Sequence, residues 1–321
     1  MLSTVGIKNL PINETPIAVI DFETTGLTPG VDRVVEVSVY RMDPGKDACL
    51  AFDTLINPER RMSATEIHGI ADEDVADAPT FSEITADFIE SISGCVIASY
   101  NVYFDIKFLD YELNQTGVFH PLPHFCLMYM RPMLNLGKRC NLESACKYHN
   151  IDYKAAHIAA NDAKVSAKLM ECYFEVLNQK NIVTYGDLAS LKSYKFINSF
   201  SETPLPDYKT FKLKKRERFL SRSSFQASIT IDPERQAVNE YWDTLRMVVA
   251  DLEITEDELS IVKQLRGKIR LPKEKIRMLH AKAFAAAIHQ FINDSWLDDI
   301  ETIKLRKLYK CLSILGWAPG E

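Results

Sequence analysis

The sequence predicts a mixed α/β domain followed by an all-helical region. Short apolar segments bounded by turn residues occur first and are then mixed with helical patterns, up to about residue 180. From residue 233 onward the pattern is helical, without the alternation expected of strands. The length of 321 residues also favours two domains over one.

Three strand-like segments open the α/β domain. They cover residues 17–22, 34–41 and 50–56. Pro29-Gly30 and Asp43-Pro44-Gly45 supply turns between them, which predicts an antiparallel meander. A further short apolar segment at 95–100 is expected to add a fourth strand.

Helical patterns fill the rest of this domain. They cover residues 63–93 with a break at Pro79, a segment that starts near Asp105, and residues 142–149 and 162–178. The last segment carries an apolar stripe at helical spacing, formed by Val165, Leu169, Cys172, Tyr173 and Val176. We therefore expect the α/β domain to occupy residues 1–180.

Residues 181–235 are less regular and contain a basic run. The run consists of Lys209, Lys212, Lys214, Lys215, Arg216, Arg218 and Arg222, with Tyr208, Phe211 and Phe219 between the charges. Two interpretations stay open. Residues 181–235 are expected to be a basic linker, and within it the basic run is either solvated or an arm that follows the phosphates of a nucleic acid.

Residues 236–321 are expected to form a separate helical domain. A weak internal repeat places an acidic turn, around Asp251 and again around Asp294, before a capped helix. These turns lack the ligand spacing and central glycine of an EF-hand, so helix capping is favoured over binding of a divalent ion. The repeat and the sequence Leu315-Gly316-Trp317 resemble TerB-like domains, which implies a docking or regulatory role and a protein partner.

The composition excludes several classes of protein. It is ordinary for a globular chain, with 46% hydrophobic and 26% charged residues. No segment reaches the ~18 apolar residues of a membrane span, and the N-terminus lacks the pattern of a secretion signal. Seven cysteines without a CxxC pair argue against a zinc site or a disulfide framework, and favour the cytoplasm. The net charge of -6 does not favour a general nucleic-acid binder, although a metal site would present its own positive charge to phosphates.

A pair of carboxylates ends the first predicted strand. Asp21 and Glu23 are two residues apart, so their side chains project from the same face of the strand. Two unpaired carboxylates at one place repel each other, and a hard divalent cation is the usual reason for such a pair. The pair therefore indicates a metal-dependent enzyme.

Two further segments combine with this pair. The three segments run from Asp21 to Leu27, from Asn101 to Asp105 and from His157 to Ala163. In this order and spacing they resemble the exonuclease motifs of the DnaQ-like, or DEDDh, superfamily of 3′→5′ exonucleases. The resemblance covers roughly residues 14–178, and it implies an RNase H-like fold in which helices flank a mixed sheet.

The resemblance assigns a role to each matching residue. It implies four metal-binding carboxylates: Asp21, Glu23, Asp105 and Asp162. It makes His157 the general base; the sister subclass has a tyrosine where this chain has Ile158. It implies contacts to the 3′-terminal nucleotide from Thr24, Thr25, Gly26, Leu27, Asn101 and Phe104.

Two positions depart from the family's pattern. Tyr100 stands where a histidine is common, and we expect it either to stack on a base or to pack. Cys126 replaces a common acidic residue. Neither change removes an expected metal ligand, so we expect activity.

The expected activity is hydrolysis of DNA, RNA or both from the 3′ end, with release of nucleoside 5′-monophosphates. Two Mg²⁺ or Mn²⁺ ions about 3.5–4 Å apart would activate a water and stabilise the leaving 3′ oxygen. One alternative is a module that binds nucleic-acid ends or a partner without cleavage. Another is a defence or repair nuclease that is regulated by its C-terminal domain.

Overall fold

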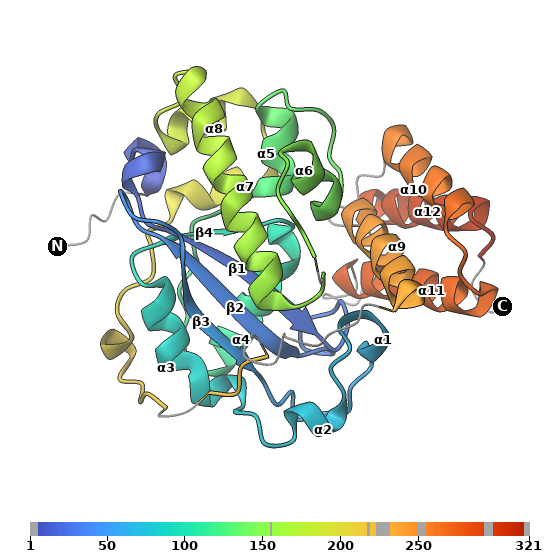
Figure 1. Cartoon of the computed structure of the whole chain (residues 1–321), viewed down its shortest axis with the longest axis horizontal. Coiled ribbons are helices and arrows are strands. Elements are labelled where there is room, and N and C mark those ends of the chain that lie inside the picture. The colour runs from blue at the N-terminus through green and yellow to red at the C-terminus, as the bar shows by residue number, and fades with distance from the viewer. Residues whose placement is uncertain are drawn as a thin grey trace.

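The fold is seen in a computed structural model, which describes residues 6–154, 156–216, 219–222, 232–249, 255–291 and 298–317. Figure 1 shows an α/β domain built on a twisted sheet, with a group of helices beside it. The predicted fold class is confirmed. The acidic turns expected around Asp251 and Asp294 lie outside the described residues.

A five-stranded mixed sheet forms the centre of the α/β domain. Its strands are β1 (Ile17–Thr24), β2 (Val34–Met42), β3 (Cys49–Leu55), β4 (Val96–Ser99) and β5 (His124–Cys126). Their order in the sheet is β3-β2-β1-β4-β5. The first three strands pair antiparallel, as the predicted meander requires, whereas β4 runs parallel to β1 and β5 parallel to β4. Residues Ile17 to Ile20 of the central strand are all buried, as expected where helices cover both faces of a sheet.

Helices cover this sheet. In chain order they are α1 (Thr65–His68), α2 (Asp72–Val75), α3 (Phe81–Ile92), α4 (Val102–Gln115), α5 (Leu127–Met133), α6 (Leu142–Tyr148), α7 (Ala159–Gln179) and α8 (Tyr185–Leu191). Helix α7 packs across β1 and β2, and α4 packs against β1, β4 and β5. Thr80 and Glu83 form a capping box that begins α3 directly after Pro79, so the predicted break is confirmed.

The sequence patterns missed β5 and α5. β5 has only three residues, too few to show alternation. In α5 most side chains are buried, including Leu127, Tyr129 and Arg131. A helix that is buried on nearly all sides has no polar face to reveal its period.

The segment after residue 180, expected to be a linker, packs along the α/β domain instead. It contains α8 and the 3₁₀ helices η3 (Lys195–Ser201) and η4 (Tyr208–Phe211); two more, η1 (Ile7–Asn9) and η2 (Ile12–Glu14), precede β1. Phe196 and Phe200 are buried in the core, and burial of large aromatic side chains is the main force available to order such a segment. At the edge of the sheet, the Leu55 N–H donates to the Leu220 carbonyl over 2.6 Å.

Part of the basic run is neutralised by α3. Lys215 pairs with Glu90, and Arg216 pairs with Glu83 at 2.8 Å. Arg218 lies outside the described residues. Within the described part of the run, these pairs favour neither a fully solvated linker nor a free phosphate-tracking arm.

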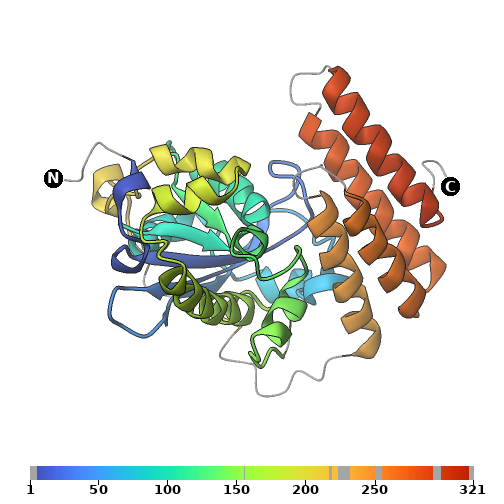
Figure 2. The same cartoon turned by 90° about the horizontal axis from the view of Figure 1, so that it is seen from above.

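The C-terminal region is helical, as predicted. Its helices are α9 (Pro233–Val249), α10 (Glu256–Lys268), α11 (Lys273–Phe291) and α12 (Asp299–Ile314). Capping boxes at Thr255–Glu258 and Asp298–Glu301 begin α10 and α12. Helix α9 lies nearest to the α/β domain (Figure 2) and contacts α1. The likeness to TerB-like domains stays a prediction. Across the described helices, none is both long and apolar enough to cross a membrane.

Candidate active site

The predicted carboxylates of the first two motifs meet at the end of β1. Asp21 and Glu23 project from this strand, whose pairing with β2 becomes irregular at Glu23 and Thr24. Asp105 lies in the first turn of α4 and joins two strands: it accepts from the Phe22 N–H over 3.1 Å and from the Ser99 hydroxyl over 2.5 Å. These bonds fix the Asp105 carboxylate beside β1.

The third motif folds around the start of α7. His157 adopts a left-handed backbone conformation, with φ of 61°, which is uncommon for a residue with a side chain. Its N–H donates to Asp162 Oδ2 over 3.0 Å, and the Tyr153 hydroxyl donates to Asp162 Oδ1 over 2.9 Å. The turn therefore holds the histidine and the last carboxylate in a fixed relation.

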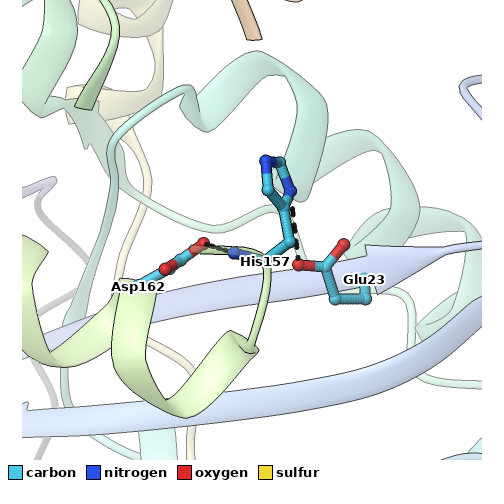
Figure 3. Close-up of side chains that lie close together, drawn as sticks. All are labelled: Glu23, His157 and Asp162. Carbon is cyan, nitrogen blue, oxygen red and sulfur yellow. Dashed lines mark hydrogen bonds and ion pairs between the residues drawn. The ribbon is translucent and has the colours of Figure 1, made fainter. Parts of the chain in front are cut away.

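These residues converge on one small cavity. Glu23, His157 and Asp162 are buried and offer ligand atoms within 4.8 Å of one another; Figure 3 shows Glu23 beside the imidazole and Asp162 beside the His157 backbone. His157 Nδ1 lies 3.8 Å from Glu23 Oε1. Asp21 and Asp105 line the same cavity, whose volume is about 50 Å³.

Three carboxyl groups of this cavity, those of Asp21, Asp105 and Asp162, have raised pKa values. Burial, followed by repulsion from the neighbouring carboxylates, raises the pKa of Asp21 well above its usual value. Burial raises the pKa of Asp105 to about 6 and that of Asp162 to about 7. A bound Mg²⁺ or Mn²⁺ would favour the ionised forms, and both ions prefer oxygen ligands. The donor set therefore fits these metals.

The residues expected to contact a nucleotide fall into two groups. Leu27, Asn101 and Phe104 line a second cavity of about 30 Å³ beside the first. Thr24 instead ends β1. Thr25 and Gly26 follow it in a turn around Asp32, where the Thr25 hydroxyl donates to Asp32 Oδ1 over 3.1 Å. The turn requires glycine, because a Cβ on Gly26 would lie 2.4 Å from Asp32 Oδ2.

The two departures from the family's pattern are accommodated by packing. The Tyr100 hydroxyl donates to the Cys140 carbonyl over 2.7 Å, and the residue is 8% exposed. This hydrogen bond and the burial favour packing over stacking on a base. Cys126 is buried, and its thiol donates to the Tyr100 carbonyl over 3.4 Å.

Arg222 is a site residue that sequence reasoning missed. Its guanidinium donates to the carbonyls of His157 and His68, each over 2.7 Å, and lies 3.1 Å from the fully buried Glu36 carboxylate. Glu36 in turn accepts from the Ala159 N–H over 3.1 Å. Arg222 and Glu36 thus hold both sides of the His157 turn. The only signal in the sequence was the basic run, which suggested solvent or phosphates as its partners.

Helix α9 supplies two more residues that were missed. Asp243 Oδ2 lies 3.4 Å from His157 Nε2, and the Arg246 guanidinium lies 3.9 Å from the centre of the Phe104 ring. Both residues line the cavity of the predicted metal ligands. Burial acts to lower the pKa of His157, but Asp243 and the nearby carboxylates outweigh it and raise this pKa to about 9.

Comparison with known proteins agrees with the motifs. The family model described as "Exonuclease" matches residues 18–170. The DNA polymerase III subunit epsilon of Rickettsia conorii is 31% identical over 220 residues, which cover 64% of this chain and 94% of that protein. The chain belongs to the DnaQ-like family of 3′→5′ exonucleases.

For other relatives the matched region is a smaller part of this chain or of the relative's own length. The epsilon subunit of Treponema pallidum is 32% identical over 46% of this chain and 72% of its own length. The PolC-type DNA polymerase III of Thermotoga petrophila is 27% identical over 58% of this chain. The match spans only 14% of that polymerase.

Proposed function

We propose that this exonuclease hydrolyses the terminal phosphodiester of a nucleic-acid 3′ end in a divalent-metal-dependent reaction. The observation that carries the proposal is the convergence of four carboxylates and one histidine, from three separate segments, on a single buried cavity. Such a set of oxygen donors beside a histidine suits hydrolysis by metal-activated water. It would be an unusual arrangement for a module that only binds.

Each side chain has a definite part in this proposal. Asp21, Glu23, Asp105 and Asp162 would hold two Mg²⁺ or Mn²⁺ ions, which supply an activated water and stabilise the leaving 3′ oxygen. His157 would accept the proton of the attacking water at an imidazole nitrogen once the ring is neutral. Beside Asp243 the ring is held as the cation, because its pKa is about 9. The Asp162 contact to the His157 N–H keeps the imidazole beside the carboxylates.

The proposed substrate is a DNA 3′ end. Several relatives are named as subunits or types of DNA polymerase III. We propose that this chain acts on the same polymer, DNA, and we do not propose that it joins the same complex. RNA stays the second candidate, because recognition of a 2′-hydroxyl depends on contacts that a bound strand would reveal. A protein partner that binds the helical region is a further part of the proposal.

End-labelled oligonucleotides test the activity. Single- and double-stranded DNA and RNA are incubated with Mg²⁺, Mn²⁺ or EDTA, and released mononucleotides are separated. We expect release from the 3′ end with either metal and none in EDTA. Asp21→Ala and His157→Ala should abolish it, whereas Asp43→Asn, a carboxylate just after β2, should not. Undiminished hydrolysis in both site variants would refute the assignment, and binding of 3′ ends without hydrolysis would favour the binding module.

A second candidate is a nuclease whose activity the helical region controls. The observation that favours it is the entry of α9 side chains into the cavity of the predicted metal ligands.

A further inference from the structure

Helix α9 occupies the space in front of the predicted catalytic residues. We propose that α9 is an internal substitute for the substrate, which fills the place of the 3′-terminal nucleotide until the helical region moves away. This inference rests on the proposed function and names the regulation of the same site. Two contacts and one shared cavity carry it, and each sets a group of α9 or α11 against a residue with a predicted catalytic or substrate role.

The first contact is between Asp243 and the predicted general base. Asp243 Oδ2 lies 3.4 Å from His157 Nε2, and Nδ1 of the same ring faces Glu23 at 3.8 Å. Carboxylates therefore face both ring nitrogens. Nε2, which faces away from Glu23, is the nitrogen left to approach the attacking water and the phosphate of a substrate. The Asp243 carboxylate lies beside Nε2 and supplies the negative charge that the phosphate would bring.

The second contact is made by Arg246, one helical turn further along α9. Its guanidinium carbon lies 3.9 Å from the centre of the Phe104 ring, the kind of stacking that a nucleobase would otherwise make. The same side chain lines the cavity that Asp21 and Asp105 also line. Arg246 thus supplies positive charge where the carboxylates would hold metal.

The third observation concerns apolar side chains that line the neighbouring cavity. Leu27, expected to lie against the terminal base, shares a cavity with Val249 of α9 and Ala286 of α11. The remaining volumes are about 50 Å³ beside the carboxylates and about 30 Å³ beside Leu27. Sites for small organic ligands typically offer about 300–1,000 Å³. A nucleotide does not fit unless α9 leaves.

Ion pairs lie at the edges of the interface between the helical region and the α/β domain, and they would allow this interface to open and close reversibly. Lys282 pairs with Glu66 at 2.5 Å, Lys138 with Asp257 at 2.7 Å, and Arg139 with Glu258 at 2.5 Å. Two of these pairs include side chains that are 27–28% or 61–70% exposed, and exposed pairs are weak and screened by salt. Intramolecular interfaces of this polar kind are expected to open more readily than apolar ones.

Binding of a DNA 3′ end by the full-length chain tests the proposal. The probe is a single-stranded DNA oligonucleotide with a 5′ fluorophore, measured by anisotropy in Ca²⁺, with its length checked afterwards. Asp243→Asn with Arg246→Met should bind about tenfold more tightly than the wild type, the equivalent of roughly 1.4 kcal/mol. The matched control is Asp299→Asn with Lys307→Gln, the same charge change at exposed positions of α12, and it should bind as the wild type does.

A second variant acts from the edge of the contact, outside the cavity. Lys282→Ala with Asp257→Ala removes two of the ion pairs and should also tighten binding. Equal or weaker binding by the Asp243/Arg246 variant, or no binding by any variant, overturns the proposal. Weaker binding would mean that Arg246 binds the DNA strand directly. The proposed function fails separately, if the variant binds more tightly yet releases no nucleotide with Mg²⁺ or Mn²⁺.

Discussion

Arg222 offers the sharpest test of how the His157 turn is held. Its guanidinium makes two hydrogen bonds to backbone carbonyls, of His157 and His68, and pairs with Glu36 at 3.1 Å. Its side chain is 15% exposed and that of Glu36 is 0% exposed. We therefore predict that Arg222→Met is strongly destabilising and that Arg222→Lys impairs catalysis more than folding.

The expected magnitude follows from what each change leaves behind. Burial raises the pKa of Glu36 to about 8 even beside Arg222, so Arg222→Met leaves a Glu36 carboxyl that is protonated at neutral pH. The variant also leaves the two carbonyls without their donor, which costs about 1–3 kcal/mol of unfolding free energy for each. Adding Glu36→Gln removes the cost of protonating this carboxyl on folding, so the double variant should be about 1–3 kcal/mol more stable than Arg222→Met alone. Arg222→Lys keeps the charge but cannot reach all three acceptors in the plane of a guanidinium. We expect its kcat to fall about 10- to 100-fold, as is common when a supporting partner of a site residue is lost.

Urea unfolding and steady-state kinetics measure these effects. Arg41→Met is a matched control, since Arg41 also donates to two carbonyls, of Ser91 and Ser93, and pairs with Asp43 at 2.9 Å, but it is 23% exposed. It should cost less stability and leave kcat unchanged. An Arg222→Met variant within 1 kcal/mol of the wild type, or an Arg222→Lys variant that changes KM alone, would refute the positioning role.

Two further predictions concern stability. Burial lowers the pKa of His280 to about 4. Its Nε2 forms a hydrogen bond of 2.7 Å with the Tyr241 hydroxyl. The unfolded state binds this proton more readily than the folded state does. The stability contributed by neutral His280 is therefore present above about pH 6.5 and is lost as the pH falls through 4. The total loss in unfolding free energy is roughly 3 kcal/mol. His280→Gln should remove that part of the pH dependence in a series of urea titrations, whereas His289→Gln, exposed on the same helix, should retain it. Gly26→Ala should cost about 1–3 kcal/mol because its Cβ would meet Asp32 at 2.4 Å, while Gly267→Ala, with open space around the Cβ in α10, should gain about 0.5–1 kcal/mol; equal thermal shifts for the two would contradict this account.

The α/β domain could be predicted where its signals are local. The alternation of a strand puts Asp21 and Glu23 on one face, and the interval between His157 and Asp162 matches the turn that opens α7. The antiparallel meander follows from two turns rich in proline and glycine. None of these predictions needs knowledge of a distant part of the chain.

The parts that could not be predicted depend on distant partners. Arg222 was placed in a basic run because nothing near it in sequence indicates that its carboxylate partner is on β2. Asp243 and Arg246 are three residues apart on an amphipathic helix, a spacing typical of a solvated face. Whether such a face meets solvent or another domain is decided by tertiary packing, which local periodicity does not report.

The electrostatics of the cavity connect metal loading to the position of α9. Burial raises the pKa values of Asp21 and Asp105, and the positive charge of Arg246 acts to lower both. A divalent cation held by the same carboxylates would repel the guanidinium, so the two positive charges compete for one site. Coupling between two ligands of one site is reciprocal. If α9 substitutes for the substrate, a variant without Arg246 should therefore bind Mn²⁺ more tightly, and saturating Mn²⁺ should weaken the docking of α9 in the wild type. Protection of α9 amides from hydrogen exchange that is the same with and without Mn²⁺ would contradict that coupling.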